Sequence, residues 1–114
     1  MKIQLERQHL RIRIDEDELA QLLDGKSLSA QTRFAKAFSI DFSVRLTDVA
    51  DANFGGNANA WIVSLPQTAV REHAARLPTR EGLSFILSGN EADSALTLLF
   101  DVDVRDSVKR RKLR

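Results

Sequence analysis

Hydrophobic and polar residues alternate along much of the chain, which is the pattern of strands with one buried face. The first two such stretches, residues 3–5 and 10–14, place their apolar residues on opposite parities. A turn within residues 6–9 explains the change of parity, and a single bulged strand would explain it equally. Arg11 and Arg13 alternate with the apolar residues of the second stretch, so we expect them to face outward.

Helix signals follow two of the strands. Asp15 can cap a helix whose capping box is closed by Glu18, and Gly25 suits a left-handed residue at its end. A second helix is predicted after Pro66, whose fixed φ suits a first helical turn. Because Pro66 directly follows the alternating residues 61–65, a strand leads straight into this helix. Strand and helix are therefore expected to pack against one core.

The rest of the pattern predicts strands at residues 28–34, 40–46, 82–87 and 96–104, with a hairpin connection at 35–38. Residues 47–59 are polar and contain Gly55 and Gly56, so we interpret them as a loop. The predicted order is ββαββ followed by βαββ. It indicates an α+β fold, with a curved antiparallel sheet or a small, partly open barrel and two short helices.

The two halves of the chain share a hydrophobic pattern. A shift of 51 positions places Ile12 and Ile14 over Val63 and Leu65, and the first predicted helix over the second. The match concerns the pattern of apolar positions and not the identity of the residues. It indicates an internal pseudo-repeat.

Charge is distributed unevenly, although the formal net charge is only +1. Residues 105–114 contain six lysines and arginines and one aspartate, a charge of +5, so residues 1–104 carry −4. The alternation ends at residue 104, and we predict a single domain over residues 1–104 and a flexible basic tail over 105–114. An acidic body argues against a surface that binds nucleic acid over its whole extent. The candidate phosphate contacts are Arg11, Arg13, Lys109, Arg110, Arg111 and Lys112.

Composition excludes several kinds of site. Without cysteine there is no disulfide and no thiolate metal ligand, which suits a cytoplasmic protein. No apolar run reaches the ~20 residues that cross a membrane, and the N-terminus has no signal-peptide pattern. His9 and His73 have no further ligands at metal-binding spacing, so we expect ordinary surface or boundary histidines. No cofactor is predicted.

Asp101 and Asp103 project from one face of the last predicted strand. Two carboxylates at this spacing can hold a hard cation such as Mg²⁺. They can also be charges that protect a solvent-facing strand from aggregation, which is the interpretation that we favour.

Trp61 and Leu99 are the candidate interface residues. Trp61 stands at the head of a strand, where tryptophan anchors either a core or an interface. Leu99 has the opposite parity to Leu98 and Phe100, so the last strand carries apolar groups on both faces. We therefore predict a homo-oligomer, most simply a two-fold dimer.

Two resemblances accompany this pattern. Residues 1–5 and 10–14, the short acidic helix, Phe42-Ser43-Val44 and residues 62–66 together resemble a family of small uncharacterised bacterial proteins, which implies no particular function. In element order alone, residues 1–46 resemble the swapped-hairpin DNA-binding domains of bacterial transition-state regulators and antitoxins.

The leading interpretation is a small, non-enzymatic protein-interaction domain that acts as a homo-oligomer. The alternative is a DNA-binding transcriptional regulator or antitoxin-like protein that binds weakly through Arg11, Arg13 and the basic tail. The third is a small-molecule or metal-dependent function at Asp101 and Asp103.

Overall fold

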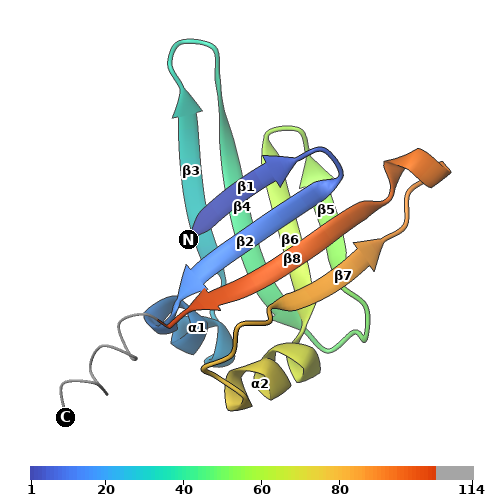
Figure 1. Ribbon diagram of the computed structural model, residues 1–114. Helices are drawn as coiled ribbons and strands as arrows, with labels where there is room; N and C mark the ends of the chain where they lie inside the picture. The colour runs from blue at the N-terminus through green and yellow to red at the C-terminus, as the bar shows by residue number, and fades with distance from the viewer. Residues whose placement is uncertain (105–114) are drawn as a thin grey trace.

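The structure is a computed structural model that describes residues 1–104 of the chain, so the predicted basic tail lies outside the described residues. Two four-stranded sheets face each other, and two helices lie at one end of the space between them (Figure 1). The elements are β1 (Lys2–Glu6), β2 (His9–Asp15), α1 (Glu16–Leu23), β3 (Leu28–Phe34), β4 (Phe38–Thr47), β5 (Asn53–Asn57), β6 (Ala60–Pro66), α2 (Gln67–Ala75), β7 (Leu83–Leu87), the 3₁₀ turn η1 (Ala92–Ser94) and β8 (Leu96–Asp103). None of the described helices has the length and apolar character of a membrane span.

Each sheet is built from two antiparallel hairpins. The first sheet has the strand order β1-β2-β8-β7 and the second has the order β3-β4-β6-β5. The hairpins meet in a central parallel pair, β2 with β8 and β4 with β6. The predicted α+β class and element order are confirmed, and among the described residues neither sheet closes into a barrel. The parallel pairs were not predicted, because pairing between distant strands leaves no local pattern.

The prediction of a loop over residues 47–59 is wrong at Asn53–Asn57, which form β5 and pair with β6. Only Phe54 in this segment is a residue type that favours strands. The pairing partner β6 therefore determines this strand more than the segment's own composition. Gly56 has a φ of 92°, and a Cβ added there would collide with the carbonyl oxygen of Ala60, so the position requires glycine.

With β5 in place, both halves of the chain have the order ββαββ. A shift of 51 positions carries β1 onto β5 and β2 onto β6 residue for residue, and the start of α1 onto the start of α2. Each half contributes its first hairpin to one sheet and its second hairpin to the other, so the halves interleave. The predicted pseudo-repeat is confirmed, and β5 is the element that completes it.

The core lies between the two sheets. The inward faces contribute Leu10, Ile12, Ile14, Leu98, Phe100 and Val102 from the first sheet and Phe42, Val44, Val63 and Leu65 from the second. Leu22 of α1 and Val70 of α2 close one end of this core. At the start of α1 the predicted capping box is present, and the Glu18 carboxylate also accepts a hydrogen bond from the N-terminal ammonium at 3.0 Å.

Candidate functional site

The outward face of the first sheet carries the predicted phosphate contacts Arg11 and Arg13, which we call the arginine pair. Both lie on β2, and Asp101 lies opposite Arg13 on the neighbouring β8. The Asp101 Oδ2 atom is 2.6 Å from Nε and Nη2 of Arg11 and 3.6 Å from Nη2 of Arg13. The alternation of apolar and polar residues along the sequence predicted that both arginines lie on an outward face. Their acidic partner comes about 90 residues later, and it neutralises part of their charge.

This ion-pair cluster bears on two of the functional alternatives. A cation bound at Asp101 would lie beside two guanidinium groups, so the local charge opposes metal binding there. Within residues 1–104, no three acidic or histidine side chains are grouped so that they could hold a metal ion. A nucleic-acid phosphate would have to compete with Asp101 for the arginine pair, and the negative charge of Asp101 would repel it.

A cavity of about 330 Å³ extends from the arginine pair to His73 on α2. The expectation of a surface or boundary histidine is wrong for His73, because its side chain is buried where α1 has Leu22. Burial and the Arg76 guanidinium lower the pKa of His73, and the Asp101 carboxylate opposes them. His73 is therefore neutral near pH 7. The cavity is also lined by Glu81 and Asp103, whereas Asp101 is engaged by the arginine pair and is no free partner for acid–base chemistry.

The predicted interface residues Trp61 and Leu99 lie on different sheets. Trp61 is partly buried on the inner side of β6, where its ring packs edge-on against Phe42 and at a tilt against Phe54. Its indole N–H donates to the Ala58 carbonyl oxygen at 2.9 Å. Leu99 is partly buried on the outward face of the first sheet, beside Arg11. The two residues are not brought together, and an interface role for either stays a prediction.

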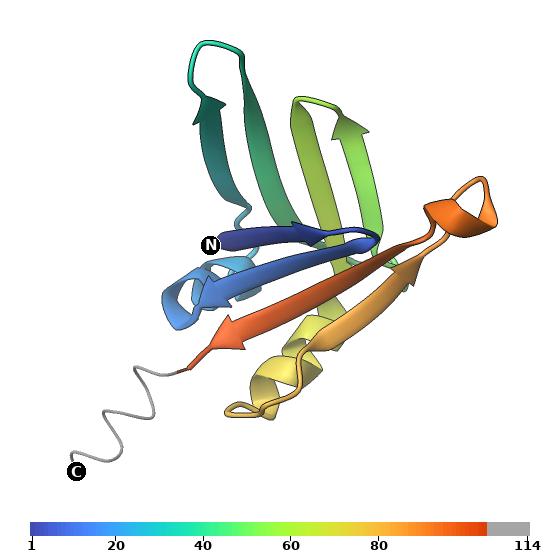
Figure 2. The same ribbon diagram turned by 45° about the horizontal axis from the view of Figure 1, so that its top comes forward.

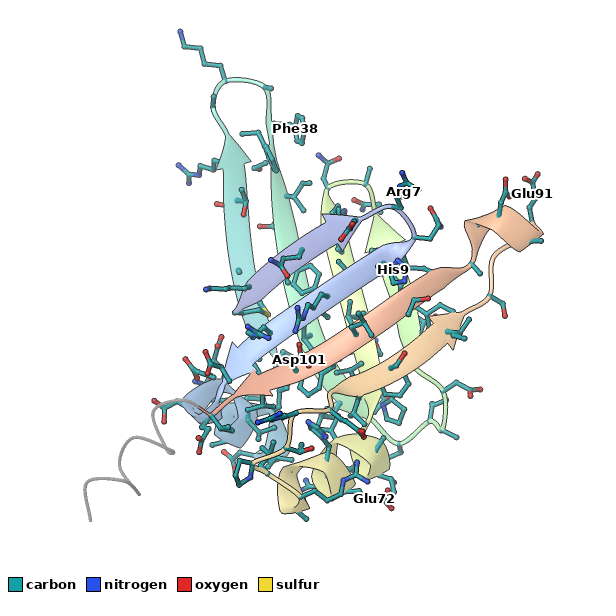
Figure 3. The ribbon with its side chains drawn as sticks, viewed as in Figure 1. Arg7, His9, Phe38, Glu72, Glu91 and Asp101 are labelled. Atoms are coloured by element: carbon teal, nitrogen blue, oxygen red, sulfur yellow. The ribbon has the colours of Figure 1, made fainter. Side chains whose placement is uncertain are left out.

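A third surface was not identified from the sequence. The outer part of the β3–β4 hairpin, residues 30–40, projects past the first sheet and is called the ribbon here (Figure 2). At its tip Phe34 and Phe38 are 44% and 53% exposed, and their rings stack with centroids 4.8 Å apart. Figure 3 shows Phe38 near the tip of the hairpin, away from the helices. The alternation of residues predicted an apolar face on this hairpin. It could not show that the first sheet is too short to cover that face at the tip of the ribbon.

Comparison with known protein families gives a match. A family model described as Family of unknown function (DUF7009) matches residues 1–106, which is almost the whole chain. It agrees with the resemblance to a family of unknown function that the sequence pattern indicated. The comparison with curated proteins gave no match. The family description names no activity, so any function must be argued from the surfaces of the molecule.

Proposed function

The chain belongs to the Family of unknown function (DUF7009), and we propose that it acts as a non-enzymatic, homodimeric protein-interaction domain. In this proposal two copies join by antiparallel pairing of β3, the edge strand of the second sheet. The observation that carries the proposal is the exposed stack of Phe34 and Phe38 on the ribbon. Aromatic residues of this kind are enriched where specific interfaces form.

The open edge of β3 supports this pairing. Among the described residues β3 pairs with β4 on one side only. Its seven residues contain one charge, Arg33, and no proline. The edges of monomeric proteins are usually protected by prolines, by inward-pointing charges or by short length. Arg33 alternates with the inward-facing Leu28 and Phe34, so it does not supply that protection.

The sequence of β3 is self-complementary when Gln31 lies on the two-fold axis. All seven residues of both strands then pair, with Leu28 opposite the partner's Phe34 and Ala30 opposite the partner's Thr32. Leu28 is buried next to the end of α1. The aromatic stack of each copy would therefore lie over the body of the other copy. On the outer face, Ser29 would lie opposite the partner's Arg33, so no like charges meet along the paired strands.

A nucleic-acid-binding regulator is the second candidate. The observation that favours it is the interleaving of two ββαββ halves, the element order on which the resemblance of residues 1–46 to swapped-hairpin domains rests. The contacts between Asp101 and the arginine pair weigh against it. The charge of −4 on residues 1–104 does so as well. We therefore place this function second.

Sedimentation velocity of the full chain tests the dimer. We expect a mass that rises with concentration toward two 12.8 kDa chains at tens of micromolar. The double variant Phe34→Ser with Phe38→Ser should remain a monomer with an unchanged circular dichroism spectrum. Val49→Ser, which removes another exposed apolar side chain, is the matched control and should still dimerise. A double variant that dimerises as the unmodified chain does would contradict the proposal.

A further inference from the structure

The strand β7 is the one outer strand of the two sheets, within residues 1–104, that contains no charge, glycine or proline. Of the other outer strands, β1 carries Lys2 and Glu6, β3 carries Arg33, and β5 contains two glycines. The five residues of β7, Leu-Ser-Phe-Ile-Leu, include no charge, no glycine and no proline. Within residues 1–104 β7 pairs only with β8, so its outer edge is open. Ile86 on this strand is 77% exposed. Such an edge is a template for an additional strand.

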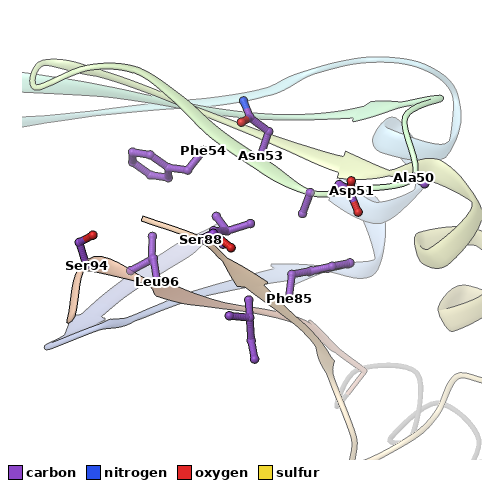
Figure 4. A pocket seen from close by; sticks show the side chains of 11 residues that line it. Ala50, Asp51, Asn53, Phe54, Phe85, Ser88, Ser94 and Leu96 are labelled. Carbon is purple, nitrogen blue, oxygen red and sulfur yellow. The ribbon is translucent and has the colours of Figure 1, made fainter. Parts of the chain in front are cut away.

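A groove runs beside this edge (Figure 4). It has a volume of about 680 Å³ and lies between β7 and residues 50–54, which include the first two residues of β5. Its apolar walls come from Phe54 on one side and from Phe85, Leu87 and Leu96 on the other. Phe85 and Leu87 share one parity of β7, and Ile86 has the other. A strand added to β7 would thus place every second side chain in the groove and would cover Ile86 with the alternate ones.

Among the described residues, the one charged side chain that lines the groove is acidic, Asp51. Residues 46–70 contain no lysine, arginine or histidine, and their charged members are Asp48 and Asp51. Residues 82–104 also contain no basic residue, and Glu91 and Asp93 lie in the turn between β7 and β8. Figure 3 shows Glu91 at the far end of this turn. Two copies of the chain joined at β7 would bring these acids together, so a second copy does not suit this edge.

We propose that β7 binds a basic peptide segment of another protein, which adds to the first sheet as an extended strand. Every second N–H and C=O group of an edge strand points outward, and these groups would pair with the backbone of the peptide. Apolar side chains of the peptide enter the groove against Phe85 and Leu96. Its lysines or arginines lie on the alternate face, beside Ile86, and are attracted by the acidic groups of Asp51, Glu91 and Asp93, which gives the partner its required charge. This inference concerns the opposite sheet from the β3 dimer and does not depend on it.

Fluorescence anisotropy with the full chain tests this proposal. The probe is a labelled seven-residue peptide with blocked ends in which lysine alternates with valine. We expect saturable binding that weakens as salt is added. A peptide with glutamate in place of lysine should not bind, because its charge matches that of the groove. A lysine peptide with proline at its central position should bind at least about tenfold more weakly, since it cannot complete the strand pairing.

Two matched variants locate the site. Ile86→Lys places a protecting charge on the β7 edge and should weaken binding of the lysine–valine peptide at least about tenfold. Leu5→Lys makes the same change at an exposed residue of β1 and should alter affinity less than about twofold. The Phe34→Ser, Phe38→Ser variant should bind the peptide normally, which separates this proposal from the dimer. No saturable binding, or equal affinities for the Ile86→Lys variant and the unmodified chain, would overturn the proposal, as would tight binding of the proline peptide.

Discussion

Replacement of Leu65 by alanine tests the core between the sheets. Leu65 is fully buried on β6, opposite Leu46 of β4, at the point where the strand leads into α2. The change removes three buried carbon atoms, which costs about 2.4 kcal/mol in transfer free energy at ~0.8 kcal/mol each. The surrounding strands can close the cavity only in part, so the total loss of unfolding free energy should be about 3–5 kcal/mol.

Leu99→Ala is the matched control, because it removes the same atoms from a partly exposed side chain on the outward face of the first sheet. No closed cavity forms there, and we expect a loss of about 1 kcal/mol. Urea unfolding followed by the fluorescence of Trp61, the single tryptophan, measures both variants at one protein concentration. Equal losses for the two variants would refute the assignment of inward and outward faces.

Three further outcomes follow from individual residues. Gly56→Ala should lower the unfolding free energy by about 1–3 kcal/mol, because residue 56 has a positive φ and a Cβ there collides with Ala60. Gly55→Ala is the control, since residue 55 has no positive φ, and it should lower the unfolding free energy less when both variants are unfolded in urea. Burial lowers the pKa of His73 below its ordinary 6.5, so its contribution to stability is fully present above pH 6.5 and is lost as the pH falls through the lowered value. His73→Leu should remove that pH dependence from thermal unfolding, and an unchanged profile would show that His73 is not its source. Nucleic-acid binding should be weak and independent of sequence. Deletion of residues 106–114 should abolish it, whereas replacement of both arginines of the arginine pair by alanine should change the affinity little. Nanomolar binding to a defined duplex that is lost in the double alanine variant would support the regulator.

Local pattern predicted most elements because their signals lie within a few residues. The capping box of Asp15 and Glu18 and the alternation of β2 and β8 are examples. β5 was missed because Asn53–Asn57 contains two glycines and two asparagines, and its strand conformation depends on pairing with β6. The parallel pairs join strands from different halves of the chain, and no local signal specifies such pairing.

For the candidate surfaces too, some features were predictable from local sequence and others depend on contacts between distant residues. The outward direction of the arginine pair followed from alternation, but its contact with Asp101 depends on the distant β8. His73 was expected near the surface, yet it is buried at the place that Leu22 occupies in the other half. The 51-residue shift could have indicated this, because it lays position 73 over position 22. Exposure of Phe34 and Phe38 depends on where the first sheet ends, which only the three-dimensional arrangement shows.

Disulfide trapping tests the β3 dimer most directly, because the chain contains no cysteine of its own. In the proposed register Gln31→Cys faces the same residue of the partner, at a distance that a disulfide can bridge. Ser29→Cys is the control on the same strand face, since its copies would lie four residues apart, or about 14 Å along the strand. Under mild oxidation we predict a covalent dimer for Gln31→Cys and little for Ser29→Cys. Equal yields for the two variants, or no covalent dimer with Gln31→Cys, would contradict the pairing of β3.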